Sequence, residues 1–154
     1  MSSFSRRSLI LSLAALPACG FTPVYGPASA LRGTVQVGTP DSSNAFALVR
    51  ALEFRLGAVE APRYQLRVGV DLTEEGSVIT PTQEIDRFTL TAEARFALET
   101  LAGAPVTDGS VRAFSSYSAS GTPMATRAAR DDAQERLMEI LADQIVTRLA
   151  GAVA

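Results

Sequence analysis

The sequence predicts an α+β fold, in which two helices pack on one face of a four-stranded, mostly antiparallel sheet. Three observations support this prediction. In residues 64–72 and in residues 88–98, apolar and polar residues alternate as in half-buried strands. A third is the helical spacing of apolar residues towards the end of the chain. The predicted order is strand, helix, three strands and helix, which leaves one face of the sheet for both helices to cover.

The chain opens with the layout of a secretory signal. Arg6 and Arg7 give a positive start, and the apolar run LILSLAAL follows at residues 9–16. This run is much shorter than the roughly 20 residues needed to span a bilayer, so we expect residues 1–18 to be removed as a signal peptide. The two arginines also resemble a twin-arginine signal, and export by either the general or the twin-arginine route stays open.

Cys19 is the single cysteine and directly follows this leader. The sequence LPAC resembles the lipobox of bacterial lipoproteins, in which the cysteine thiol is acylated and becomes the new N-terminus. A disulfide is excluded because no second cysteine exists. Several acyl chains such as palmitate hold a protein at a membrane durably, whereas one holds it only marginally. We therefore expect Cys19 to be a lipid anchor, and Gly20 after it, by analogy with bacterial sorting, favours the outer membrane on its periplasmic side.

The rest of the chain divides into a tether and one domain. Residues 19–33 are rich in Pro, Gly, Ser and Ala and lack periodicity, as expected of a lipid-anchored tether. Residues 34–150 are long enough for a single α+β domain. Without the two leader arginines, 12 basic residues face 16 acidic ones, and the net charge is about −4. A broad nucleic-acid binder would instead be basic.

The first half of the domain is predicted to hold a short strand, a helix and a long strand. Residues 34–37 alternate, and the helix follows several N-cap candidates at 41–44, with Phe46, Val49, Leu52 and Leu56 on its apolar face. The long strand covers residues 64–72, a turn is expected at 74–77, and extended structure resumes at 78–80. The first strand, which is reached through the helix, is expected to pair parallel with a neighbour, and the long strands antiparallel.

The second half is predicted to hold two more strands and a long helix. Residues 88–98 alternate clearly, and residues 111–117 alternate more weakly after a connection over 103–109. The helix begins at Met124 or Thr126. Its apolar positions are Ala129, Ala133, Leu137, Ile140, Leu141, Ile145 and Leu149.

Residues for catalysis are scarce. The chain has no histidine, which removes the usual general base and a common metal ligand, and it lacks the GxSxG and HExxH motifs. The adjacent carboxylates Glu74 and Glu75, like Asp131 and Asp132, point apart in a strand or a helix. We therefore expect no enzyme activity, no catalytic residue, no cofactor and no metal.

Arginines offer the clearest candidates for binding. Arg67, Arg87 and Arg95 alternate with the apolar residues of the two long strands, so they belong to the solvent-facing side of the sheet. Arginine suits contacts with phosphates and carboxylates, and these three are candidates to contact a glycolipid or a barrel. Simple solvation of a polar face is the alternative.

Two segments resemble the lipopolysaccharide-assembly lipoproteins of the LptE family, alphaproteobacterial type. Residues 19–26, CGFTPVYG, are similar to the CGF-x-P-[LV]-Y motif that opens the mature chain of that family. Residues 117–120, YSAS, with the helix after them, resemble its closing segment. Only the opening motif is specific.

The resemblance implies both a fold and a role. It implies two helices on a four-stranded sheet, and a plug inside the LptD outer-membrane β-barrel that inserts lipopolysaccharide into the outer leaflet. The partners would be LptD, lipopolysaccharide and the membrane through the anchor at Cys19, without nucleic acid or a cofactor. Two alternatives remain: a lipoprotein of another envelope lipid-transport system of the ABC type, and a periplasmic hydrolase, against which the missing histidine argues.

Overall fold

Three long strands and two helices make up most of the computed structural model, which describes residues 31–79, 85–119 and 121–153. The sheet has the order β1-β2-β3-β4, in which β1 pairs parallel with β2 and the other pairs are antiparallel. This arrangement confirms the predicted α+β class and the parallel first strand. The elements are β1 (Val35–Val37), α3 (Ser43–Leu56), β2 (Tyr64–Ile79), β3 (Ile85–Thr100), β4 (Pro105–Ser118) and α4 (Pro123–Val153).

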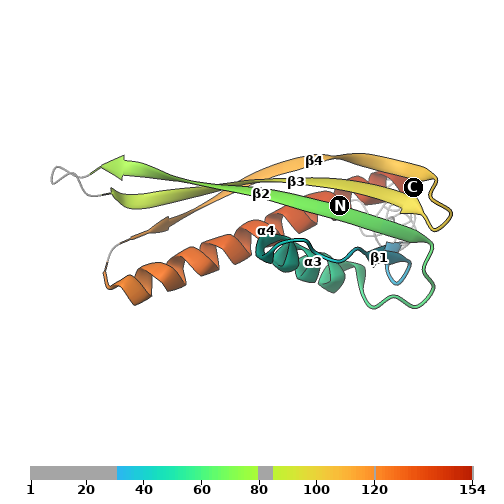
Figure 1. Ribbon diagram of the computed structural model, residues 1–154, viewed down its shortest axis with the longest axis horizontal. Coiled ribbons are helices and arrows are strands. Elements are labelled where there is room, and N and C mark those ends of the chain that lie inside the picture. Colours follow the sequence, from blue (N-terminus) through green and yellow to red (C-terminus); the bar gives the residue numbers. More distant parts are fainter. Residues whose placement is uncertain (1–30, 80–84, 120, 154) are drawn as a thin grey trace, which may run out of the picture.

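The molecule is elongated, with both helices on the same side of the sheet (Figure 1). Strands β2 and β3 have 16 residues each, which at about 3.3 Å per residue gives roughly 50 Å. Helix α4 has 31 residues and is about 46 Å long. The β3–β4 turn and the α3–β2 loop lie at one end, and the end of β2 and the start of α4 lie at the other (Figure 1).

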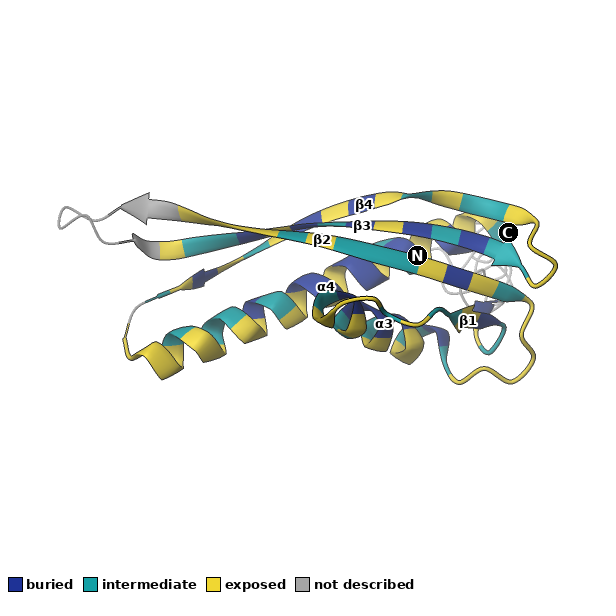
Figure 2. Cartoon of the chain, in the orientation of Figure 1, coloured by how far each residue is buried: buried dark blue, intermediate teal, exposed yellow. Residues whose placement is uncertain are grey.

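The core lies between the helices and the sheet. Figure 2 shows buried and half-buried residues alternating with exposed ones along the strands, as expected when one face of a sheet is covered. Large side chains with almost no exposed area come from every layer, and they include Leu48, Leu52, Leu66, Leu90, Leu98, Leu137, Leu141 and Ile145. The apolar positions of the alternating strands therefore face the helices, as their period of two predicts.

Both helices begin at local sequence signals, and α3 also ends at one. The Ser42 side chain accepts a hydrogen bond of 3.1 Å from the Ala45 amide at the start of α3. Gly57 ends this helix with φ of 76°, a conformation that glycine adopts without strain. Thr122 accepts a bond from the Ala125 amide at 3.3 Å, and Pro123 takes the first position of α4, where its missing N–H costs nothing.

Two strand boundaries differ from the prediction. The turn expected at residues 74–77 is wrong, because β2 runs on to Ile79 and pairs Glu74 with Leu90 on β3. Strand β4 begins at Pro105 and not near residue 111, so the expected connection is partly strand. In both places the hydrogen-bonded ladder with β3 extends the strand through residues with poor strand propensity, which tertiary context commonly overrides.

Two of the apolar side chains predicted to be buried lie outside the core. Phe46 is 62% exposed and Ile140 is 42% exposed, although their helical spacing predicted burial. Phe46 directly follows the buried Ala45, and Ile140 directly precedes the buried Leu141. One position along a helix corresponds to a rotation of about 100°, so each exposed side chain points away from its buried neighbour. Each helix has a buried stripe too narrow to include them.

Leu31 marks the start of the described chain. It lies within the segment expected to be tether, yet its side chain is fully buried in the core. The folded region therefore includes residues before position 34. The predicted signal peptide, Cys19 and the rest of the tether lie outside the described residues.

Candidate functional site

The outer face of the sheet, which lies opposite the two helices (Figure 1), is largely polar. Every second side chain of β2, β3 and β4 belongs to it, and the strand register arranges these side chains in rows of three. Charged residues fill rows nearer the β3–β4 turn, and hydroxyl residues fill rows farther from it. The rows are Arg67, Ala97 and Asp108; Gly69, Arg95 and Ser110; Asp71, Glu93 and Arg112; Thr73, Thr91 and Phe114; and Glu75, Thr89 and Ser116.

Three arginines of this face form ion pairs with carboxylates on a neighbouring strand. The pairs are Arg67 with Glu99, Arg95 with Asp71 at 2.5 Å, and Arg112 with Glu93 at 2.6 Å. The hydrogen bond between Arg112 and Glu93 lowers the pKa of the carboxyl and raises the pKa of the guanidinium. Pairs this exposed contribute little to stability, so a ligand phosphate can replace the carboxylates at small cost.

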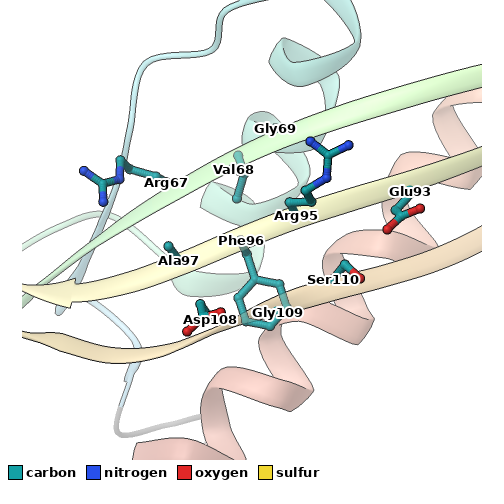
Figure 3. A pocket seen from close by; sticks show the side chains of 10 residues that line it. All are labelled: Arg67, Val68, Gly69, Glu93, Arg95, Phe96, Ala97, Asp108, Gly109 and Ser110. Atoms are coloured by element: carbon teal, nitrogen blue, oxygen red, sulfur yellow. The ribbon is translucent and has the colours of Figure 1, made fainter.

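A shallow depression of about 570 Å³ lies on the outer face around Gly69 (Figure 3). A Cβ atom at Gly69 would meet nothing within 4 Å, so the missing side chain leaves the space open. Arg67 and Arg95 project from neighbouring strands at its rim, and Glu93 and Asp108 also line it (Figure 3). The depression is therefore lined by two arginines and two carboxylates, and the two guanidinium groups point apart (Figure 3), towards Glu99 and Asp71 respectively.

The structure brings together two of the three predicted arginines. Arg67 and Arg95 are diagonal neighbours on paired strands, a relation that sets Cβ atoms about 7–8 Å apart. Arg87 lies eight positions from Arg95 along β3, a distance of about 27 Å, and it pairs with Ser118 near the opposite end of the sheet. Arg67 and Arg95 therefore line the same depression, and Arg87 does not.

A second surface lies on the helix side of the molecule. Phe54 on α3 is 84% exposed, and it lines a groove of about 340 Å³ between α3 and α4. Ion pairs of Arg50 with Glu135 at 2.5 Å and of Arg55 with Asp143 connect the two helices across this region. Large exposed aromatic side chains are typical anchors of protein interfaces. This surface was not predicted, because periodicity indicates which side chains are buried in the core and does not indicate which exposed side chains contact a partner.

A polar cluster connects β2, β4 and α4 on the inner side. Glu74 accepts hydrogen bonds from the Tyr117 hydroxyl and from Arg130 Nε, the latter at 2.9 Å. These two bonds lower the pKa of Glu74, and burial together with the carboxylate raises the pKa of Tyr117 to about 12. The Tyr117 ring also stacks on Phe88, with ring centroids 5.3 Å apart. Glu74 was predicted to lie in a turn, although it is in phase with the apolar series of residues 64–72.

The described residues offer neither a metal site nor a membrane-spanning helix. Within residues 31–79, 85–119 and 121–153, no cluster of three or more acidic, cysteine or histidine side chains is arranged to hold a metal ion. No helix in these ranges is long and apolar enough to cross a bilayer. The predicted anchor residue Cys19 lies outside them.

Comparison with known proteins identifies similar chains. Residues 33–149 match the model of the family described as LptE, lipopolysaccharide-assembly. A protein described as a lipoprotein from Caulobacter crescentus CB15 is 22% identical, with a TM-score of 0.68 over 83% of this chain and 96% of that one. No curated protein sequence matches the chain.

Two further solved structures are similar at lower identity. Rare lipoprotein B from Shewanella oneidensis is 16% identical, with a TM-score of 0.57 over 77% of this chain and 92% of that one. A minor lipoprotein from Acinetobacter baumannii is also 16% identical, with a TM-score of 0.53 over 77% and 89%. At such identities these likenesses show a shared fold.

Proposed function

The chain belongs to the LptE lipopolysaccharide-assembly family, and from this we propose that it is an outer-membrane lipoprotein that plugs and stabilises the LptD β-barrel. The complex would assemble lipopolysaccharide at the cell surface. Cys19 would carry the lipid anchor, and the domain would face the periplasm and act by binding, without catalysis or a cofactor. The observation that carries this proposal is the family match over residues 33–149.

The shape and the outer face support a plug. The domain is slender and roughly 50 Å long, estimated from its 16-residue strands, and such a body fits lengthwise inside a large barrel. The lumen of a transmembrane barrel is polar. The outer face resembles it in polarity, because three of its arginines are paired with carboxylates and threonine and serine lie in the distal rows, although Phe114 is exposed among them.

Two phenylalanines on α3 supply contacts for the barrel wall. Phe46 and Phe54 are 62% and 84% exposed, and eight positions between them correspond to about 80° of rotation around the helix. They therefore lie on neighbouring parts of one helix surface. Burying such aromatic side chains against a partner contributes strongly to binding, since each removes a large apolar area from water.

The depression at Arg67 and Arg95 supports contact with a phosphorylated glycolipid. Phosphate groups bind arginine through paired N–H donors, and the Arg67 and Arg95 side chains are more than 60% exposed in their present ion pairs. The partner of Arg95, Asp71, is 69% exposed, so exchanging this carboxylate for a phosphate leaves no charge buried without a partner. Lipopolysaccharide carries phosphates on lipid A, which is the ligand that the family relation suggests.

The proposal is tested by isolating the full-length protein from its own outer membranes in mild detergent. We expect a β-barrel of several hundred residues to co-purify, and depletion of the protein to reduce surface lipopolysaccharide. Recovery of an inner-membrane ABC complex would favour the alternative lipid-transport role. Recovery of the protein alone, with normal surface lipopolysaccharide, would contradict the proposal.

Matched variants distinguish the surface that contacts the barrel. Phe54→Glu should lower the yield of co-purified barrel, because it brings a charge into an apolar contact. Phe114→Glu is the comparison variant, since Phe114 is 71% exposed on the outer face, where an added charge meets the polar lumen and should be tolerated. Loss of the barrel with Phe114→Glu alone would assign the contact to the sheet and not to α3.

The glycolipid contact has its own control within the predicted set. The double variant Arg67→Ala and Arg95→Ala should weaken binding of purified lipopolysaccharide, measured on the protein in detergent. Arg87→Ala removes an arginine of the same sheet that lies far from the depression, and it should leave binding unchanged. An equal loss in both variants would show a general effect of charge.

A further inference from the structure

Three segments meet at one end of the molecule. They are residues 31–34, the α3–β2 loop at 57–63 and the β3–β4 turn at 101–104 (Figure 1). The Gly33 amide donates to the Leu56 carbonyl at 2.9 Å, and the Leu101 amide donates to the Arg63 carbonyl at 3.2 Å. Backbone hydrogen bonds therefore fix these segments side by side, and we name them together the apolar tip.

The apolar tip exposes mainly uncharged side chains. Val59 is 45% exposed and Leu101 is 56% exposed, and Glu60 is the acidic residue of the three segments. A monomeric domain rarely gathers exposed apolar residues at one place unless the place contacts something. The other exposed apolar residues of the tip and of the position after it are Ala58, Ala61, Pro62, Ala102, Ala104 and Pro105.

Arginines flank these apolar residues. Arg32 and Arg63 are exposed, and the Arg32 guanidinium lies close to Gly57, since its Nε is 3.7 Å from the position of a Cβ there. An arginine can bury its aliphatic stem along an apolar surface and direct its charge towards lipid phosphates. Apolar side chains surrounded by arginine suit the headgroup region of a bilayer.

The position of the predicted anchor favours the same contact. The described chain begins at Leu31, whose side chain is buried at this end, and the 11 residues 20–30 separate it from Cys19. Fully extended, they span at most about 40 Å, less than the length of the strands. We propose that the apolar tip rests on the headgroup region of the bilayer in which the acyl chains are inserted, an inference that depends on the proposed anchor at Cys19.

A fluorescent reporter can test this contact, because the chain contains no tryptophan. The acylated protein carrying Leu101→Trp is reconstituted into vesicles of phosphatidylethanolamine and phosphatidylglycerol, some of them with brominated acyl chains. We expect its emission to shift to shorter wavelength and to be quenched by the brominated lipid. Val59→Trp provides a second tip variant, and Phe114→Trp on the outer face provides the control that stays unquenched.

The outcomes separate the tip from the anchor. Flotation of the protein with the vesicles reports anchoring, and quenching reports the tip. Flotation with both tip variants unquenched, or with all three variants quenched equally, would overturn the tip contact alone. Failure to float would overturn the anchor and the tip together, whereas the barrel partner is tested separately by co-purification.

Discussion

Glu74 lies on the helix-facing side of β2, where the preceding members of its alternating series are apolar. Its carboxylate accepts hydrogen bonds from Tyr117 on β4 and from Arg130 on α4. One residue thus connects two strands of the sheet to the start of the long helix. A carboxylate at this position is stabilised by its two partners and not by water alone.

We expect Glu74→Gln to lower the free energy of unfolding by about 1 kcal/mol, because it removes charge-assisted hydrogen bonds at a partly exposed site. The adjacent Glu75→Gln, on the opposite face of the strand, should have almost no effect. Urea denaturation of both variants measures the difference. An equal effect of both variants would contradict this role.

The contribution of Glu74 to stability should depend on pH. Since its partners lower the pKa of Glu74, this contribution is present at neutral pH and should disappear as the pH falls and the carboxyl is protonated.

The contribution of Tyr117 to stability should change at alkaline pH. Its pKa is raised from about 10 to about 12 by burial and by Glu74, so its protonated form is favoured in the folded protein. Its contribution is complete below pH 10 and should be lost as the pH rises towards 12. We expect the stability difference between the wild type and Tyr117→Phe to change within this window, measured by thermal unfolding at several pH values. A difference that is constant from pH 8 to 12 would contradict the assignment.

Helix α4 packs on the sheet through one narrow stripe of buried side chains. Its buried side chains begin at Ala133 and continue to Ala150, whereas none of the preceding helical residues is buried. The first turns of α4 therefore extend past the core. The ion pair of Arg130 with Glu74 connects this part of α4 to β2.

Neighbouring residues of α4 test the direction of this stripe. Leu141→Ala should lower the free energy of unfolding by about 2–5 kcal/mol, because it leaves a cavity in the core. Ile140→Ala should cost much less, about 1 kcal/mol or below, since this side chain is 42% exposed. Chemical denaturation compares the two. Similar losses would mean that α4 is rotated on the sheet.

The whole molecule has two unlike ends and two unlike sides. One end carries the apolar tip near the start of the described chain, and the other carries the end of β2 and the start of α4 (Figure 1). One side is the polar outer face, and the other exposes phenylalanines on α3. Separate surfaces of one domain can thus contact a bilayer, a barrel and a glycolipid.

The anchor is tested at this scale by Cys19→Ser. We expect the variant to lose its acyl chains and much of its membrane association, because several chains are needed for durable binding. Its circular dichroism and melting temperature should remain those of the wild type, since Cys19 is not among the residues of the described core. Mass spectrometry of the mature chain and membrane fractionation without the barrel partner provide the measurements. An unmodified wild-type cysteine in the native cell would contradict the anchor.

The fold and the candidate site were predictable to different degrees. The period of two along residues 64–72 and 88–98 predicted half-buried strands, and the outward positions of Arg67 and Arg95 followed from it. The depression between them was not predictable, because it depends on the register that sets Gly69 opposite Arg95. The exposure of Phe46 was also missed, since helical spacing alone does not show how wide a stripe the sheet covers.

The sequence by itself determined the element types, their order and the inward or outward side of each strand residue, because these follow from local periodicity. It also contained the motif around Cys19, which requires no folded context. Only the tertiary structure decided where the strands end, which arginines lie together, which partners Glu74 binds, and that the apolar loops meet at one end. These features depend on contacts between residues distant in the chain, and such contacts are set by strand register and helix packing, which no single segment encodes.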